Sequence, residues 1–461
     1  MSRTLLVSLA LVMVASAEVG AQPPAARTGD AAAELQRAFA AEVGVAGGLT
    51  AAHAAERALV HSPSAAARRE DVAIADSQLA GTKLEFLPRA TLTGRYTRLS
   101  STGDTEIEGL PVPVTLPGAL EDQWSVGVQV AVPLSDYVLR LGHAVRARRH
   151  STRAAEWMSR AERRQAAAQA RLAYYDWARA TLGVLVAERA RTQAAQHRDL
   201  AGRRVAAASA TRADLLLAES RLGEAEELVT RAQLDANLAE RQLRVVMGER
   251  GRAQLAIGED VLAPLPGGEG DAERLVGVAL AARPELRALG EGDGALAAEA
   301  RLEAARYFPR LDLVGNVARE NPNSRAFPQS DEFDTVWDVS LVLSWAFDDI
   351  PRAREKRREL AARRRRVDDE RRQLVDGIVL EVTQAVQQVK AAEKSIATTG
   401  GTLVAAEEGH RVRQRLFEVG SASSTELGDA ENDLTRARFA VIDAHIALRK
   451  AHVALDRAVG K

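Results

Sequence analysis

The sequence contains no cysteine, so it can form no disulfide, and it offers no cysteine for lipid attachment behind a signal peptide. Aromatic residues make up only 4% of the chain, which favours extended helices in close contact over a compact aromatic core. The formal net charge is -1, which gives no reason to expect a nucleic acid partner. Beyond the N-terminus, no apolar run reaches the roughly 18 residues that a membrane-spanning helix needs.

Residues 1–21 have the pattern of a secretory signal peptide. Arg3 precedes an apolar run, and small residues behind that run allow cleavage after Ala17 or Ala21. The run is too short for a membrane anchor. Residues 22–48 are rich in alanine, glycine and proline, and we expect them to form a flexible arm in an exported protein.

The rest of the chain is one unit written twice. A repeat this long does not indicate a solenoid, so we interpret it as a duplicated half-protein. We expect a first repeat at 49–250 with a β-hairpin at 87–134, a linker at 251–272, and a second repeat at 273–461 with a β-hairpin at 309–347. The matching pieces are Ser62-Pro63 with Arg283-Pro284, Leu87-Pro88-Arg89 with Phe308-Pro309-Arg310, Trp124-Ser125-Val126 with Trp337-Asp338-Val339, and Leu215–Gly248 with Leu427–Gly460.

Each half contains a segment in which apolar and polar residues alternate, at 124–134 and at 337–347. A period of two places the apolar side chains on one face of a strand, and eleven residues extend about 35 Å. A tilted strand of that length fits a membrane barrel. Weaker partner strands are expected at 90–97 and 311–317. The side chains predicted to face lipid are Trp124, Val128, Trp337, Leu341 and Trp345.

The alternation alone fits a half-buried strand of a soluble sheet equally well. The signal peptide, the tryptophans at the strand ends and the duplication favour the membrane. Residues 100–123 and 320–336 are rich in turn-forming residues, and we expect them to form long loops facing outward from the cell. Four strands cannot close a barrel, and open edges are costly in lipid. The chain must therefore oligomerise if it inserts; two copies would give eight strands and three would give twelve.

Apolar residues at alternating spacings of three and four predict long paired helices. One such series runs from Leu215 to Val246 and the other from Leu427 to Ala458, with leucine, valine and alanine at the seam. Stretches without proline at 139–208 and 352–419 could each extend on the order of 100 Å as helix. The basic run Arg363–Arg366 lies in the second stretch and is expected to be a solvated helix face.

Signals of enzyme chemistry are missing. The sequence has no Gly-Lys-Ser/Thr phosphate loop and no Gly-x-Ser-x-Gly elbow. His143 and His150, like His445 and His452, are seven residues apart, which is not a metal-binding spacing. We therefore expect no catalytic residue, no metal site and no cofactor.

The ordered, duplicated set of motifs resembles the TolC family of outer-membrane efflux and secretion channels over about residues 49–460. The resemblance implies a mostly α fold with β, in which duplicated long antiparallel helical hairpins form an α-helical barrel. It also implies a homotrimer whose four strands per chain close a twelve-stranded transmembrane β-barrel in outer-membrane lipid. The motifs that carry the resemblance are Ala58-Leu59-Val60-His61-Ser62-Pro63, Leu87-Pro88-Arg89, Phe308-Pro309-Arg310, Phe417-Glu418-Val419-Gly420-Ser421, Thr425-Glu426-Leu427 and Ala454-Leu455-Asp456-Arg457-Ala458-Val459-Gly460.

The resemblance also implies where partners act. The two helix-hairpin tips, at 204–214 and 415–426, would dock a periplasmic adaptor (membrane fusion) protein, which would connect the channel to an inner-membrane transporter. The tip residues are Ala208, Ser209, Asp214, Gly420 and Ser421.

Glu426 and Asp429 match a pair of inward carboxylates that would ring the periplasmic entrance and attract cations. The alternative is an acidic helix start, and both interpretations can hold together. In the first repeat Asp214 replaces Glu426, but Leu217 replaces Asp429.

We therefore predict a passive conduit, opened at its periplasmic end by an adaptor. It would be the exit duct of a tripartite efflux pump or of a type I secretion system. The alternative function is that of a periplasmic coiled-coil adaptor or scaffold, which would explain the heptads and would leave the alternating strands without a purpose.

Overall fold

A computed structural model describes residues 45–103, 105–107, 114–116, 118–249, 251, 255–265, 271–327 and 329–461. The predicted signal peptide (1–21) and nearly all of the predicted arm (22–48) lie outside these residues. Within the described part of the chain, no helix is both long enough and apolar enough to cross a bilayer.

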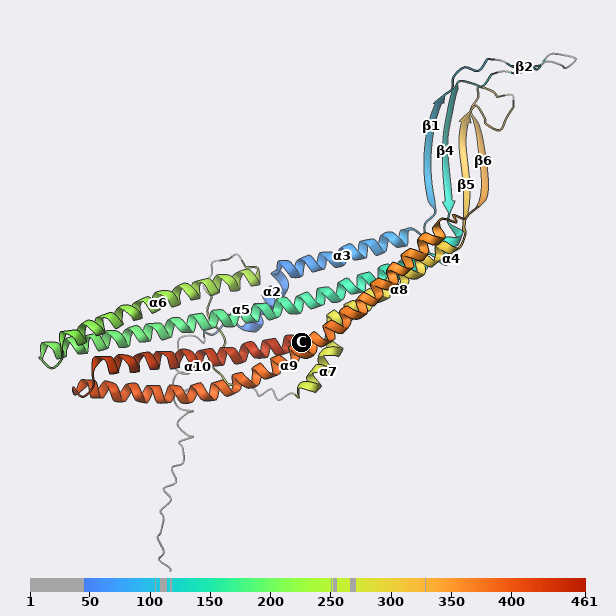
Figure 1. The fold of residues 1–461 in the computed structure, drawn as a ribbon. Coiled ribbons are helices and arrows are strands. Elements are labelled where there is room, and N and C mark those ends of the chain that lie inside the picture. Colours follow the sequence, from blue (N-terminus) through green and yellow to red (C-terminus); the bar gives the residue numbers. More distant parts are fainter. Residues whose placement is uncertain are drawn as a thin grey trace, which may run out of the picture.

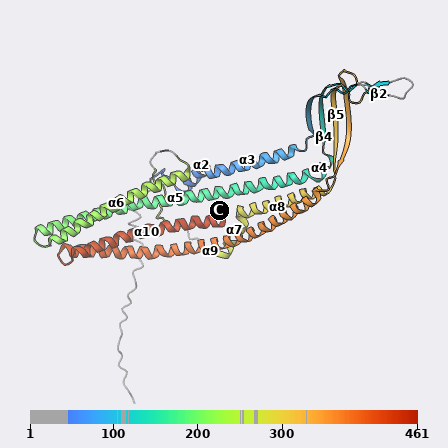
Figure 2. The same ribbon diagram turned by 45° about the horizontal axis from the view of Figure 1, so that its top comes forward.

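The molecule is elongated, with a β-sheet at one end and long helices running away from it (Figure 1). The two longest helices are α5 (Leu141–Ala206), with 66 residues, and α9 (Asp349–Glu418), with 70 residues. At about 1.5 Å per residue each is about 100 Å long. The view in Figure 2 shows the shorter helices lying along these two. The predicted mostly helical fold is confirmed.

The helices nearer the sheet show the duplication directly. In the first half, α2 (Ala51–His61) is followed by α3 (Pro63–Leu84); in the second half, α7 (Ala272–Ala282) is followed by α8 (Pro284–Ala304). Both α3 and α8 begin with proline, a favourable first residue because the N–H that it lacks would have no partner in the helix. The short helices α4 (Leu134–Leu139) and η1 (Ala305–Tyr307) lie next to the sheet.

The helices far from the sheet are also matched. α6 (Arg212–Met247) packs against α5, and α10 (Ser424–Val459) packs against α9; each has 36 residues. Both end at a glycine in the left-handed conformation, Gly248 with φ 69° and Gly460 with φ 83°. A side chain with a Cβ is strained there, so glycine ends both helices at the same place.

The sheet has four antiparallel strands in the order β1-β4-β5-β6. They are β1 (Arg89–Arg98), β4 (Asp122–Val132), β5 (Arg310–Asn321) and β6 (Asp334–Ser344). Both predicted hairpins are therefore present, and β4 and β5 join them into one sheet. The outer edges of β1 and β6 have no partner strand within the described chain.

Several predicted boundaries are wrong. The predicted strand at 124–134 ends at Val132, and α4 begins at Leu134. The predicted loop at 100–123 contains a small second hairpin, β2 (Thr105–Ile107) with β3 (Val114–Leu116). The predicted strand at 337–347 ends early, at Ser344, because the carbonyl of Ala346 already accepts the N–H of Asp349 in the turn into α9. Trp345 therefore lies just past the strand, where its ring is 4.7 Å from that of Phe347.

The described part of the linker is held by a buried arginine. Arg449 of α10 is 6% exposed and donates to the backbone carbonyls of Val261, Asp260 and Ala263. Its guanidinium also pairs with Glu259 at 2.7 Å. Glu259 in turn accepts from the hydroxyl of Tyr175, whose pKa is raised to about 12, mainly by burial and then by the Glu259 charge. Arg449 thus fixes the linker against the middle of the helices.

Candidate functional site

The two helix-hairpin tips lie side by side at the end of the molecule farthest from the sheet (Figures 1 and 2). They are the turn between α5 and α6 and the turn between α9 and α10. Ala208 and Gly420 occupy equivalent positions in these turns, and both have left-handed backbone, with φ 53° and 84°. Only the second tip has the residue that this conformation favours. Ala208 is the one described residue other than glycine with positive φ.

The same capping arrangement starts the helix behind each tip. The Thr211 N–H donates to the Asp214 carboxylate at 3.0 Å, and the Ser423 N–H donates to the Glu426 carboxylate at 2.8 Å. Each hydroxyl accepts in return from the backbone N–H of its acidic partner. These bonds favour the charged form, so the pKa values of Asp214 and Glu426 are lowered, chiefly by Thr211 and Ser423.

Hydrogen bonds join the two tips of one chain into a single surface. Arg204 of the first hairpin donates to the carbonyl of Phe417 at 2.8 Å and to that of Ser209 at 2.9 Å. Its guanidinium lies 4.6 Å from the centre of the Phe417 ring. From the other side, the Ser424 hydroxyl donates to the carbonyl of Asp214 at 3.2 Å. The predicted tip residues Ala208, Ser209, Asp214, Gly420 and Ser421 are thus brought together on one end of the protein.

A buried histidine supports this end and was not foreseen from the sequence. His197 of α5 is 3% exposed; its Nδ1 lies 3.1 Å from Glu431 and its Nε2 lies 3.0 Å from the Ser424 hydroxyl. The Phe417 ring packs against it edge-on at 5.1 Å. No residue near His197 in the chain indicates these contacts, because both partners lie on α10, more than two hundred positions later.

The two carboxylates predicted to ring the entrance are exposed, and each already has a partner. Glu426 is the capping residue described above. The carboxylate of Asp429 accepts from the guanidinium of Arg221 on α6 at 3.3 Å, and Arg221 also lies 3.6 Å from Glu224. The helix-start interpretation therefore holds for Glu426, while Asp429 links α6 to α10. Whether the pair faces a pore stays a prediction.

The sheet has one apolar face that crosses all four strands. Val128 lies opposite Leu92 and Val317, and Val317 lies opposite Trp337. These four side chains therefore share a face, together with Trp124, Leu313 and Leu341. Their exposure is large, reaching 72% for Leu92 and 67% for Trp337. An apolar surface of this extent needs a covering phase or partner.

The opposite face is polar. Gln129 lies opposite Asn316, and the Asn316 amide donates to Asp338 at 2.9 Å. Arg325, from the connection between β5 and β6, donates to the same carboxylate at 2.8 Å. A cavity of about 650 Å³ opens on this face. The sheet thus separates an apolar side from a polar one.

Comparison with known proteins gives a consistent result. The model of the family described as "Outer membrane efflux protein" matches residues 54–249 and 275–461. The chain is similar in structure to the outer-membrane channel OprN, at 20% identity over 88% of this chain and 89% of that one, with a TM-score of 0.72. It is similar to the CmeC outer membrane channel of Campylobacter jejuni, at 12% identity over 88% and 84%, with a TM-score of 0.74. It is also similar to the MtrE outer membrane channel of Neisseria gonorrhoeae, at 17% identity over 89% and 88%, with a TM-score of 0.72.

Proposed function

Because this chain belongs to the outer membrane efflux protein family, we propose that three copies form its working state, the exit duct of a tripartite efflux pump or of a type I secretion system. The protein is an outer-membrane channel, with its sheet in the membrane and its helices in the periplasm. In the proposed homotrimer, three four-stranded sheets close one barrel of twelve strands. The proposal includes the division of the chain into two structural repeats, at 49–250 and 273–461.

The alternative function, a periplasmic coiled-coil adaptor, is wrong. The matched family is that of outer-membrane efflux channels. The four-stranded sheet with a continuous apolar face agrees with that assignment, and an adaptor would have no use for it.

The observation that best supports a trimer concerns the two lateral edges of the chain. On the same two edges, the sheet has unpaired strands and the helices have exposed apolar side chains. The edge strands β1 and β6 lack partners, and in lipid an unpaired edge is prohibitively costly. The edge helix α6 likewise carries a second apolar stripe opposite the seam that it buries. On α6 the exposed residues Leu216, Leu234, Leu238 and Val245 fall within about 40° of one another at 3.6 residues per turn.

On α9 two exposed leucines, Leu380 and Leu416, lie on the side opposite its buried seam, ten turns apart. Neighbouring copies that pair β6 with β1 would also bring α9 beside the α3 and α6 edge. Lateral packing would then cover the strand edges and the exposed apolar side chains together. When the same contact is repeated by rotation about one axis, the copies form a closed ring.

The joined tips supply the proposed docking surface for a periplasmic adaptor, which would open the periplasmic end and connect it to an inner-membrane transporter. Arg204 and Ser424 hold the two tips together, so an adaptor would meet both as one unit. The channel itself would be passive. Solutes would pass through a lumen lined by the polar face of the sheet, and no covalent step would take place.

The deciding experiment measures mass and conductance on the full mature protein. In nonionic detergent we expect a protein mass three times that of one chain, and in planar bilayers we expect discrete channel openings. A mass equal to one chain, with no conductance after reconstitution, would refute the proposal. A dimer that conducts would refute the twelve-stranded barrel while leaving the channel function in place.

A further inference from the structure

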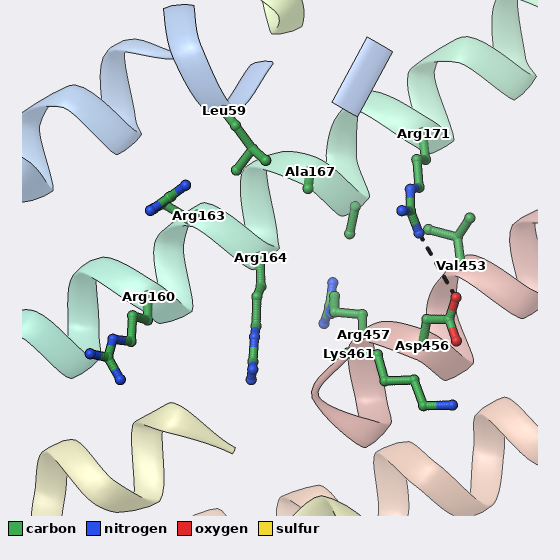
Figure 3. Close-up of a pocket in the computed structure, with 11 residues that line it drawn as sticks. Leu59, Arg160, Arg163, Arg164, Ala167, Arg171, Val453, Asp456, Arg457 and Lys461 are labelled. Atoms are coloured by element: carbon green, nitrogen blue, oxygen red, sulfur yellow. Dashed lines mark ion pairs between the residues drawn. The ribbon is translucent and has the colours of Figure 1, made fainter. Parts of the chain in front are cut away.

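A pocket lined by arginines lies near the middle of the molecule, away from both the tips and the sheet. It is bounded by α5, by the end of α10 and by Leu59 of α2, and its volume is about 320 Å³ (Figure 3). That volume falls within the range of small-molecule sites, about 300–1,000 Å³. The cationic side chains lining it are Arg160, Arg163, Arg164, Arg171, Arg457 and Lys461.

Only one lining side chain, Asp456, carries a negative charge among the residues that the structure describes. It lies 3.8 Å from Arg171, the pair joined by a dashed line in Figure 3. Arg457 pairs outside the pocket with Glu381 at 2.9 Å, and Arg164 donates to the carbonyl of Ala282 at 3.2 Å. Most of the positive charge is thus left without a carboxylate. A cleft lined by one sign of charge concentrates the opposite ion.

Four of the six cations make no ion pair within the described chain: Arg160, Arg163, Arg164 and Lys461. Of these, Arg160, Arg163 and Lys461 are exposed. Arg160 lies with its guanidinium 4.3 Å from the ring centre of Trp157, a contact that leaves its N–H groups open to an anion. Guanidinium groups bind carboxylate and phosphate through paired N–H donors, so the chemistry present selects oxyanions.

The pocket also has apolar walls. Leu59, Ala167, Ala168 and Val453 line it, and Figure 3 shows Leu59, Ala167 and Val453 between the charged side chains. A hydrated inorganic ion would leave these walls unused. We propose that the pocket binds a small organic anion that carries at least two oxyanion groups, carboxylate or phosphate, on a short apolar body.

The pocket would remain accessible in an oligomer. α5 packs against α3 and α6 on one side and against α8 and α10 on the other. The pocket between α5 and α10 therefore lies inside one chain, whereas the edges available to neighbours are α3, α6 and α9. The inference is independent of the proposed channel function, since conductance can fail without affecting binding here.

The test is calorimetric titration of the full mature protein in nonionic detergent. The probes are benzene-1,3-dicarboxylate and benzene-1,3-bisphosphonate, the neutral benzene-1,3-dicarboxamide of the same shape, and inorganic pyrophosphate. We expect one or both of the ring dianions to bind, with the tighter one identifying the oxyanion class, and the neutral amide and pyrophosphate to bind at least tenfold more weakly. Equal binding of the amide would overturn the role of charge, and equal binding of pyrophosphate would overturn the role of the apolar walls.

A pair of double variants locates the binding. Arg163→Gln with Lys461→Gln removes two exposed cations that make no ion pair and should weaken binding of the dianion at least tenfold. Arg365→Gln with Arg371→Gln removes two exposed cations from α9 and should leave it unchanged. Equal affinity of both double variants and the parent would show that the dianion binds elsewhere, and no binding by any probe would also overturn the proposal.

Discussion

At several equivalent positions, the two repeats of this protein carry different residues. Glu426 and Asp214 cap equivalent helices in the same way, yet only the second repeat adds an acid one turn later, at Asp429. Ala208 and Gly420 take the same left-handed backbone with different side chains. Such pairs give matched experiments within one chain, because one repeat is the control for the other.

The first prediction concerns the charge of the entrance. Glu426→Gln with Asp429→Asn should weaken cation selectivity in single-channel recordings, because three chains would lose six carboxylates. Asp214→Asn is the matched control and should have a smaller effect, since its tip has no second acid. The lowered pKa of Glu426 means that this carboxylate stays charged to a lower pH than an ordinary glutamate, so its share of the selectivity should persist into mildly acidic solution. Unchanged selectivity in the double variant would leave these residues as a helix cap and an interhelical ion pair only.

The second prediction concerns the turns. Ala208→Gly should stabilise the protein slightly or leave it unchanged, because relief of left-handed strain of about 1–2 kcal/mol is partly offset by the greater freedom of glycine in the unfolded chain. Gly420→Ala should destabilise it by about 1 kcal/mol for the opposite reason. A Cβ there would also lie 3.2 Å from the Arg204 guanidinium. Thermal or denaturant unfolding of both variants measures the difference; the same sign for both would contradict the argument.

At the scale of elements, strands and helices follow simple periods, and most of them could be predicted. Alternation located β4 and β6, and spacings of three and four located α6 and α10. The end of β6 was missed because Trp345 continues the alternation while the backbone has already turned. The contacts of His197, Arg204 and Arg449 could not be predicted, since they depend on which faces meet between segments far apart in the sequence.

The third prediction tests the faces of the sheet. Val128→Arg should destabilise the inserted protein by about 2–4 kcal/mol if that residue lies near the bilayer midplane. Gln129→Arg, on the polar face of the same strand, should be tolerated. The folded fraction in lipid vesicles across a denaturant series measures both. Equal loss at the two positions would mean that the assignment of faces is wrong.

The fourth prediction tests the linker clamp. The buried guanidinium of Arg449 donates hydrogen bonds to three backbone carbonyls and to Glu259. Arg449→Met removes this guanidinium and leaves those acceptors unsatisfied. Breaking a buried pair in this way costs about 3–5 kcal/mol. We expect a lower unfolding temperature and faster proteolysis between α6 and α7. Lys450→Met, which removes the neighbouring exposed ion pair with Asp176, should cost far less; similar losses in the two variants would argue against the clamp.

At the scale of the whole molecule, the proposed assembly depends on the open edges. Leu234→Asp with Leu238→Asp places charge on the exposed apolar stripe of α6 and should shift detergent-solubilised protein from trimer to smaller species. Each leucine, if fully buried between chains, would contribute about 1.5–3 kcal/mol. The control variant is Gln233→Asp with Asn237→Asp, which adds the same charge at exposed positions about a quarter-turn away from the stripe. An unchanged trimer mass in the leucine variant would remove α6 from the interface.

The duplication has a consequence for the symmetry of the assembled entrance. In the proposed trimer, three chains would present six tips, alike in backbone because both repeats use the same turn and the same capping arrangement. Because the side chains of the two tips differ, the rim of that trimer would have sixfold symmetry in its backbone and threefold symmetry in its charge. A partner that contacts only the backbone of the tips would have six equivalent binding sites. A partner that contacts Asp429 would have three. The stoichiometry of docking would then report which of the two surfaces the partner recognises.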